Sequence, residues 1–254
     1  MFIKPDWPVP EEDIIAFTTT KLGGVSKGDF ESLNLSLNVG DDPLSVRKNR
    51  KLVEKELPYG TKIKWLQQVH GGAVTRANSF CLEKADASWT NQSGWACAIQ
   101  TADCLPVLFC DVNSTCVAAA HVGWRGLLCG VLENLIMEIP ANPSKMIAWL
   151  GPRIGPKVFV IGEEVRDEIS AWISHKGGSS GKFFKDHPSI ENFYLTDLSR
   201  LAKFAISVSG VSKMYDSNVC SYSESQLFFS HRRDLGRTGR MVTLIAINPK
   251  SSLT

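Results

Sequence analysis

The sequence predicts a single domain of the α+β class that spans residues 1–254. Strand-like patterns occur along the whole chain, and amphipathic segments with helical spacing lie between them. The chain has 254 residues, of which 43% are hydrophobic and 21% are charged, which is enough to bury one large core. The most linker-like segment, residues 175–181, is short and has globular flanks, so we interpret it as a surface loop rather than a domain boundary.

The N-terminal part contains three predicted strands and one predicted helix. Residues 14–20 and 64–69 have the character of short strands. Residues 33–39 alternate leucine or valine with polar side chains, which is typical of a half-buried strand. Asp42 provides an N-cap for a helix over residues 43–57, where apolar residues recur at helical spacing until a proline ends the run.

A central hairpin is predicted within residues 101–126, where two apolar strands fold back on each other. A two-residue loop at residues 112–113 would place Cys104 directly opposite His121. Moving that loop by one residue makes the pair diagonal but leaves both side chains on one face. Pro106 donates no ladder bond, which predicts a sheet edge or a bulge at the start of this strand. A thiol and an imidazole are therefore expected together at the open end of the hairpin.

The motif Gly-Trp-Arg-Gly after His121 opens a predicted one-sided amphipathic helix of about three turns that ends at Pro140. The N–H groups of its first turn and its dipole favour an anion. Arg125 in that motif would add a bidentate fork for phosphate or carboxylate. The alternative is an exposed or packing arginine with no ligand.

The remaining segments alternate between strands, helices and loops. A polar loop follows Asp86, and a charged turn lies within residues 222–240. Residues 196–197 supply the cap of a further helix that ends before Gly210. The other predicted elements are strands at residues 95–100, 146–150, 157–161 and 242–247 and a helix at residues 163–173.

Three side chains are candidate metal ligands. His70 follows a predicted strand and precedes two glycines, which permit a tight turn and close approach by a ligand. With Cys104 and His121 it would supply two nitrogen ligands and one sulfur ligand, a set that holds catalytic zinc and leaves a fourth position open. Neither Cys-x-x-Cys nor His-x-x-x-His accompanies them, so a buried free cysteine beside two unrelated histidines is an open alternative.

A second functional interpretation of the hairpin needs no metal. Cys104 would be a thiolate nucleophile, with His121 as its base. Asp103 alternates to the other face of the strand, so we expect it to orient neighbouring groups rather than to bind a metal.

Composition and charge exclude several classes of protein. The net charge is +2 with both signs interspersed, so the basic stripe of a nucleic-acid-binding protein is missing. No run approaches the roughly 20 apolar residues of a membrane span, and the N-terminus is not a signal peptide. Seven scattered cysteines argue for a reducing compartment, and we expect the cytoplasm. The partners expected are small molecules, without nucleic acid or membrane, and the sequence assigns no oligomeric state.

Four long motifs occur in order along the chain. They are Gln67-Gln68-Val69-His70-Gly71, Thr101-Ala102-Asp103-Cys104-Leu105-Pro106, His121-Val122-Gly123-Trp124-Arg125-Gly126 and Phe228-Phe229-Ser230-His231-Arg232-Arg233-Asp234. Together these motifs resemble the purine nucleoside phosphorylase family once labelled laccase or polyphenol oxidase. Shorter matches at residues 23–26, 40–42, 49–50 and 151–155 extend the resemblance over nearly the whole chain. Lys21, where many members have arginine, and Val122, where alanine is usual, depart from the family pattern.

The resemblance implies one laccase-like domain over residues 1–254, with mixed sheets and flanking helices in layers, similar to the fold of certain cysteine-dependent toxin hydrolases. It implies a mononuclear site on His70, Cys104 and His121, holding zinc. The implied activities are phosphorolysis of adenosine, inosine, guanosine or methylthioadenosine, and deamination of adenosine. Some bacterial members are instead associated with editing of peptidoglycan precursors, so a cysteine- or zinc-dependent amidase is the alternative.

Phosphorolysis requires residues that hold phosphate near the anomeric carbon. Arg125 and Arg233 are the first candidates. Further candidates for substrate or phosphate binding are Lys21 and Arg50, which belong to the matched motifs. Lys21 lies in a glycine-rich turn, and the alternative is that this turn is a loop without a ligand. A lysine at position 21 would bind phosphate less directionally than a guanidinium fork.

The oxidase label can be weighed by the number of histidines. A blue copper centre and a trinuclear cluster together require many imidazoles, and the chain has five histidines. A four-copper phenol oxidase is therefore not expected. One copper ion in place of zinc remains an alternative, because copper outcompetes zinc at most nitrogen and sulfur sites.

Overall fold

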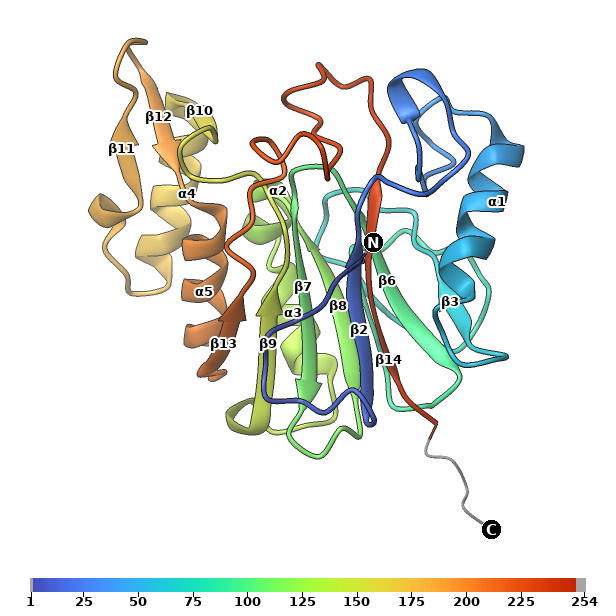
Figure 1. Cartoon of the computed structure of the whole chain (residues 1–254). Coiled ribbons are helices and arrows are strands. Elements are labelled where there is room, and N and C mark those ends of the chain that lie inside the picture. The colour runs from blue at the N-terminus through green and yellow to red at the C-terminus, as the bar shows by residue number, and fades with distance from the viewer. Residues whose placement is uncertain (1, 250–254) are drawn as a thin grey trace.

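Two β-sheets pack face to face in the computed structural model, which describes residues 2–249 (Figure 1). The five-stranded sheet has the order β1 (Phe2–Ile3), β2 (Ile14–Thr19), β14 (Met241–Ile247), β6 (Trp95–Thr101), β3 (Lys62–Lys64). The six-stranded sheet has the order β13 (Lys213–Asp216), β9 (Met146–Leu150), β7 (Leu105–Asp111), β8 (Val117–Val122), β5 (Ala87–Thr90), β4 (Val74–Arg76). Antiparallel pairs dominate, but β3–β6, β4–β5 and β9–β13 are parallel, so both sheets are mixed.

Helices cover the outer faces of the two sheets. Figure 1 shows α1 (Pro43–Glu54) on one side of the molecule and α4 (Glu163–His175) and α5 (Leu198–Val208) on the other. The short helices α2 (Trp124–Leu128) and α3 (Val131–Glu138) follow β8. A small third sheet, β10 (Val160–Gly162), β12 (Phe193–Thr196) and β11 (Phe184–Asp186), lies beside α4. The predicted α+β class with mixed sheets and flanking helices in layers is confirmed.

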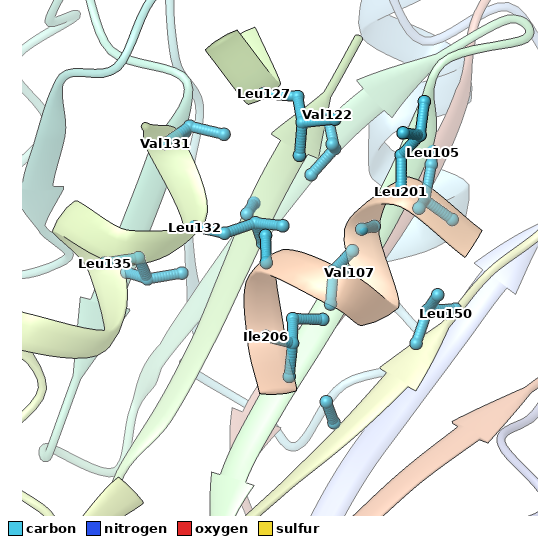
Figure 2. Packing of buried hydrophobic residues seen from close by; sticks show 14 of the residues in the cluster. Leu105, Val107, Val122, Leu127, Val131, Leu132, Leu135, Leu150, Leu201 and Ile206 are labelled. Carbon is cyan, nitrogen blue, oxygen red and sulfur yellow. The ribbon is translucent and has the colours of Figure 1, made fainter. Parts of the chain in front are cut away.

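Three hydrophobic clusters hold these layers together. One fills the space between the sheets and includes Ile99 of β6 and Trp149 of β9. A second lies beneath α1. The third, the largest, lies between the six-stranded sheet and the helices α3 and α5, where Leu132 and Ile206 pack toward Val107 (Figure 2). Strands of the six-stranded sheet are thus buried on both faces, which explains their almost continuous apolar sequences.

Several predicted elements are confirmed with small changes at their ends. Asp42 caps α1, and Asp197 caps α5, each through side-chain oxygens that accept two backbone N–H groups of the first turn. The predicted strands at 14–20, 95–100, 146–150 and 242–247 correspond to β2, β6, β9 and β14, and the helix at 163–173 corresponds to α4. Among residues 2–249, no helix is both long and apolar enough to cross a bilayer.

The predicted strand at residues 33–39 is wrong. Leu33 and Leu35 are buried, but the backbone there pairs with isolated carbonyls of Lys21 and Arg240 instead of a neighbouring strand. Leu37, which the alternation assigned to the same buried face, is 41% exposed. The two buried leucines of this loop are two residues apart, so over a short run their spacing is the same as that of a strand.

Three other predicted segments differ from the observed elements. The strand expected at 64–69 ends at Lys64, and the polar segment after Asp86 forms β5 instead of a loop because it pairs with β8. The strand expected at residues 157–161 is β10, which begins only at Val160. The sequence did not predict the short strands β1, β4, β11, β12 and β13.

The hairpin and the helix after it also need correction. Pro106 lies in a central strand, not at an edge, between β9 and β8. It is the second residue of β7, and its carbonyl still accepts a bond from the backbone N–H of Gly151. The long helix predicted to end at Pro140 is divided into α2 and α3, because Gly130 adopts a left-handed φ of 74° between them.

A buried ion-pair network around Asp216 lies under α5, away from the hairpin. Its carboxylate binds Arg153 at 2.5 Å and Lys203 at 2.6 Å, and accepts hydrogen bonds from the Ser199 hydroxyl and the Asn218 backbone N–H. Burial opposes ionisation, but these partners outweigh it and lower the pKa of Asp216 from 3.8 to about 2. The carboxylate therefore stabilises the folded protein above pH ~4, and this contribution is lost as the pH falls toward ~2.

We expect Asp216→Asn to lower the free energy of unfolding by about 2 kcal/mol at pH 7, because the depressed pKa of Asp216 corresponds to about that much linkage energy. Urea denaturation of wild type and variant at pH 7 and near pH 2 measures this. The difference between the two proteins should largely vanish at the lower pH. An equal difference at both pH values would contradict the network's electrostatic role.

Candidate metal centre and cavity

Three segments far apart in the sequence bring His70, Cys104 and His121 together. One donor atom from each lies within 4.8 Å of the other two. His121 is on β8, Cys104 directly precedes β7, and His70 lies in the loop between β3 and β4. Pro106 pairs with His121 across the hairpin, so of the two predicted registers the one with Cys104 diagonal to His121 is observed.

Asp86, directly before β5, organises both histidines. It is fully buried, and its Oδ1 lies 2.7 Å from His121 Nδ1. The same carboxylate accepts backbone N–H bonds from His70 at 2.9 Å and Gly71 at 2.8 Å, and from Val69 at 3.1 Å. Burial opposes its ionisation, but the bonds from His121 and these N–H groups outweigh that effect and lower the pKa of Asp86. One charged side chain thus fixes the ring of His121 and the backbone of His70.

The backbone at the site is held in unusual conformations. His70 has a φ of 60° and Asp103 has a φ of 89°. Both values lie in the left-handed region, which residues other than glycine rarely adopt. A Cβ at Gly123 would lie 3.1 Å from Cys104 Sγ and from His70 Cδ2. Glycine at this position therefore lets the two ligand-bearing segments approach each other.

The thiol and the imidazole stabilise each other's charged forms. Burial raises the pKa of Cys104, but His121 and His70 outweigh burial and lower it to about 6. Burial lowers the pKa of His121, but Cys104 and Asp86 outweigh it and raise it to about 9. The neighbouring histidines favour the thiolate of Cys104, which is the form that binds metals and attacks electrophiles.

This donor set fits a transition metal. His121 gives its Nδ1 to Asp86, so its Nε2 is left for a metal, and a carboxylate behind a histidine ligand is typical of metal sites. His70 Nε2 lies 3.7 Å from Cys104 Sγ. Two imidazoles and one thiolate suit zinc, and also copper.

A cavity of about 520 Å³ opens at this cluster. All three candidate ligands line it, together with apolar residues such as Leu66, Ile154 and Phe159. Its positively charged lining residues are Arg125, Arg232 and Arg240, and its lining also includes His231. A volume of this size accommodates a small organic molecule such as a nucleoside.

The structure places the predicted anion-binding residues in different environments. Arg125 lines the cavity, with its guanidinium 4.3 Å from the Trp124 ring centre. The helix that carries it has five residues, too few to add the dipole that the sequence predicted. Arg233 faces a second hollow. Its guanidinium donates hydrogen bonds to Asp234 and to three backbone carbonyls.

Lys21 and Arg50 also lie outside the lining of the first cavity. Lys21 borders the second hollow beside Arg233. Arg50 stacks on Trp65 at 3.6 Å and donates its Nε–H to the Leu35 carbonyl. Burial lowers its pKa to about 10. Arg50 is therefore tied to the neighbouring backbone and Trp65, and Lys21 borders a different hollow from the one at the cluster.

Asp86, Arg232 and Arg240 lie at the cluster or line its cavity, although they are not among the site residues predicted from the sequence. Asp86 was interpreted only as the start of a loop, although an acidic residue before a strand that pairs with β8 would have predicted its position beside His121. Asp103, expected to orient neighbouring groups, accepts bonds from Ser221, Ser230 and the backbone N–H of Arg232. It ties the segment that carries Arg232 to the turn that carries Cys104.

The remaining histidines do not extend the cluster. His175 ends α4 and His187 caps a loop through its Nδ1. His231 lines the cavity, but within residues 2–249 the group of neighbouring metal-binding side chains contains His70, Cys104 and His121 without it. The donors thus suit one ion and not the several that a four-copper oxidase requires.

Comparison with known proteins gives matches over nearly the whole chain. The sequence profile of a family described as multi-copper polyphenol oxidoreductase laccase matches residues 15–248. The purine nucleoside phosphorylase YfiH of Escherichia coli is 42% identical over 245 residues, covering 96% of this chain and 97% of that protein. A purine nucleoside phosphorylase of Pseudomonas aeruginosa is 41% identical over 244 residues, with the same coverage.

Solved structures agree with these sequence matches. A protein of Neisseria meningitidis superposes with a TM-score of 0.89 at 40% identity, covering 98% of this chain and 99% of that one. YlmD of Geobacillus stearothermophilus superposes with a TM-score of 0.88 at 29% identity, covering 98% and 96%.

Proposed function

Because the chain belongs to the family described as multi-copper polyphenol oxidoreductase laccase, with purine nucleoside phosphorylases among its relatives, we propose that it is a metal-dependent purine nucleoside phosphorylase. The observation that carries the proposal is the His70–Cys104–His121 cluster at a cavity lined by three arginines. The proposed substrates are adenosine, inosine, guanosine or methylthioadenosine, together with phosphate.

Phosphorolysis sets clear demands on the site. An oxygen of phosphate forms a bond to C1′ of the nucleoside, the C1′–N9 bond breaks, and its electron pair leaves with the purine, which takes up a proton. The protein must therefore hold an anion beside the sugar and stabilise charge that develops on the purine. Arginines of the cavity meet the first demand, and its apolar wall gives a surface for the purine ring.

We propose that His70, Cys104 and His121 hold zinc, with copper as the alternative. When bound, such an ion supplies Lewis-acid polarisation of an oxygen or nitrogen of the substrate. Asp86 orients His121 and fixes the loop of His70, so the ligands are in place before a metal arrives. Cys104 contributes the negative charge of the set.

Purified protein with inosine tests this proposal. We expect hypoxanthine and ribose 1-phosphate in equal amounts, with formation of both depending on added phosphate. Adenosine in the same assay separates two activities, since phosphorolysis gives adenine, whereas the deamination that we propose as a second activity gives inosine and ammonia. Absence of turnover with every purine nucleoside, in protein that contains metal, would contradict the proposal.

A cysteine-dependent amidase acting on peptidoglycan precursors is the competing candidate. The observation that favours it is the lowered pKa of Cys104 beside His121, an arrangement that also activates nucleophilic cysteines. It predicts amide hydrolysis that persists after metal removal. A copper-dependent phenol oxidase is a weaker third candidate because the cluster offers ligands for one ion.

We also propose a reducing compartment, the cytoplasm, as the place where the protein acts. All seven cysteines are free thiols in the structure, and a thiolate ligand must stay reduced to bind a metal. The partners proposed are its small-molecule substrates, a purine nucleoside and phosphate.

A further inference from the structure

Arg240 is a partly buried arginine at the wall of the cavity that contains the metal-binding cluster. It directly precedes β14 and lines the cavity together with Cys104 and His121. Its Nη1 donates to the carbonyls of Thr238 and Gly239, each at 2.9 Å. These two bonds fix the guanidinium from one end. They leave Nη2 and Nε of Arg240 without a partner in the part of the chain that the structure describes.

The positive charge of Arg240 has no carboxylate partner among residues 2–249. Asp103 is the acidic residue of the cavity lining. Its Oδ1 accepts a bond from the Ser221 hydroxyl, and its Oδ2 accepts bonds from the Ser230 hydroxyl and the backbone N–H of Arg232. Burial lowers the pKa of Arg240, with Cys104 and Asp103 acting in the opposite direction. Arg240 forms no ion pair with either group, so part of the cost of burying its charge remains unless an anion binds there.

Two other arginines that are buried or partly buried show what a structural role looks like. Arg153 is buried, and it forms a bidentate ion pair with Asp216. Arg233, on the same segment as Arg240, pairs with Asp234. Arg240 differs from both, because it is held rigidly and its unoccupied donors belong to a residue of the cavity wall.

The two other arginines of the cavity are less well fixed. Arg125 is exposed and has only the Trp124 ring beside it. Arg232 is exposed, and its Nη1 donates to the Val160 carbonyl. Both side chains can contribute positive charge to the cavity. Arg240 is the one with a preorganised fork, which suits the planar, bidentate recognition of a phosphate group.

We propose that Arg240 anchors an oxyanion subsite of the cavity that binds a phosphate group next to the Cys104 side. The identification of the free phosphate ion as its occupant rests on the proposed phosphorolysis. The same chemistry would recognise the phosphate of a nucleoside 5′-monophosphate. Arg240 replaces Arg233 in the role that the sequence suggested for the latter.

Binding of inorganic phosphate to Arg240→Gln and Arg240→Lys, measured by calorimetry on the metal-containing protein, tests the subsite. We expect the Kd for phosphate to rise about tenfold to hundredfold in Arg240→Gln, since a charged hydrogen-bonded fork is lost, and less in Arg240→Lys. Arg237→Ala is the matched control, because Arg237 is 83% exposed and lies in the second hollow, paired with Asp29. Its Kd should equal that of wild type.

A measurement on the wild-type protein avoids any folding defect of the variants. Phenylglyoxal modifies free arginines, and mass spectrometry locates the modified residue. Phosphate should protect Arg240 from modification and leave Arg237 unprotected. Equal modification of Arg240 with and without phosphate and also with and without adenosine 5′-monophosphate would overturn the proposal. An unchanged Kd in Arg240→Gln, for whichever of these two ligands the wild type binds, would do the same.

Adenosine 5′-monophosphate in place of phosphate identifies the source of the anion. If the monophosphate binds in an Arg240-dependent way and free phosphate does not, the subsite stands and the proposed phosphorolysis fails. If free phosphate binds in an Arg240-dependent way but no nucleoside is cleaved, the subsite likewise stands and the proposed phosphorolysis fails. If wild type binds neither ligand, the subsite itself is wrong.

Discussion

Replacing Cys104 with alanine should leave the protein folded but nearly free of metal and without turnover. Cys104 is the negatively charged donor of the cluster, and its removal leaves the imidazoles of His70 and His121, whose ring centres are 4.6 Å apart, as the remaining donors of the cluster. Loss of a direct ligand should exceed the roughly 10- to 100-fold effect typical of groups behind the ligands. Metal analysis and initial rates with inosine and phosphate measure both effects.

Cys129→Ala is the matched control for this experiment. Cys129 is an exposed free thiol after α2 and is not part of the cluster. It should keep its metal and its rate, and the melting temperatures of the two metal-free variants should be similar. Full metal content in Cys104→Ala would show that the ion is held elsewhere.

Asp86→Asn is expected to weaken metal binding about 10- to 100-fold and to destabilise the fold by about 3 kcal/mol. An amide keeps one acceptor oxygen, so either the pair of bonds from His70 and His121 or the pair from Val69 and Gly71 is lost. Unsatisfied buried N–H groups cost about 1–3 kcal/mol each, and an unfixed ligand ring lowers metal affinity. Urea denaturation of the metal-free protein and competition with a zinc indicator measure the two effects separately.

Asp111→Asn separates the two effects of the Asp86 variant. Asp111 is a buried carboxylate at the turn of the β7–β8 hairpin and also accepts several backbone N–H bonds, from Asn113, Thr115 and Cys116. We expect a similar loss of stability and an unchanged metal affinity. Equal losses of metal affinity in both variants would mean that Asp86 acts only through general stability.

Local patterns predicted the parts of the site that lie on one hairpin. The period of two along a strand placed Cys104 and His121 on one face in either register. A shift of the loop by one residue therefore did not change the prediction that the two side chains lie together. Cap residues such as Asp42 and Asp197 located helix starts for an equally local reason. Mixed sheets and layers followed from motif resemblance rather than from these patterns.

The parts that failed depend on contacts between distant segments. Asp86 reaches His121 only because β5 pairs with β8, and the polar residues after Asp86 gave no sign of a strand. Arg233 and Arg240 are both arginines of one irregular segment, yet one faces its own aspartate and the other faces the cavity. Sequence spacing contains no information on which side of a loop a side chain lies.

Metal removal and reconstitution test the central claim most directly. Wild-type protein stripped by a chelator should lose phosphate-dependent cleavage of inosine and regain it in proportion to added zinc, up to one equivalent per chain. The same stripped protein should not hydrolyse an amide of a peptidoglycan precursor. Full nucleoside cleavage in metal-free protein, or amide hydrolysis that survives the chelator, would contradict a catalytic metal on His70, Cys104 and His121.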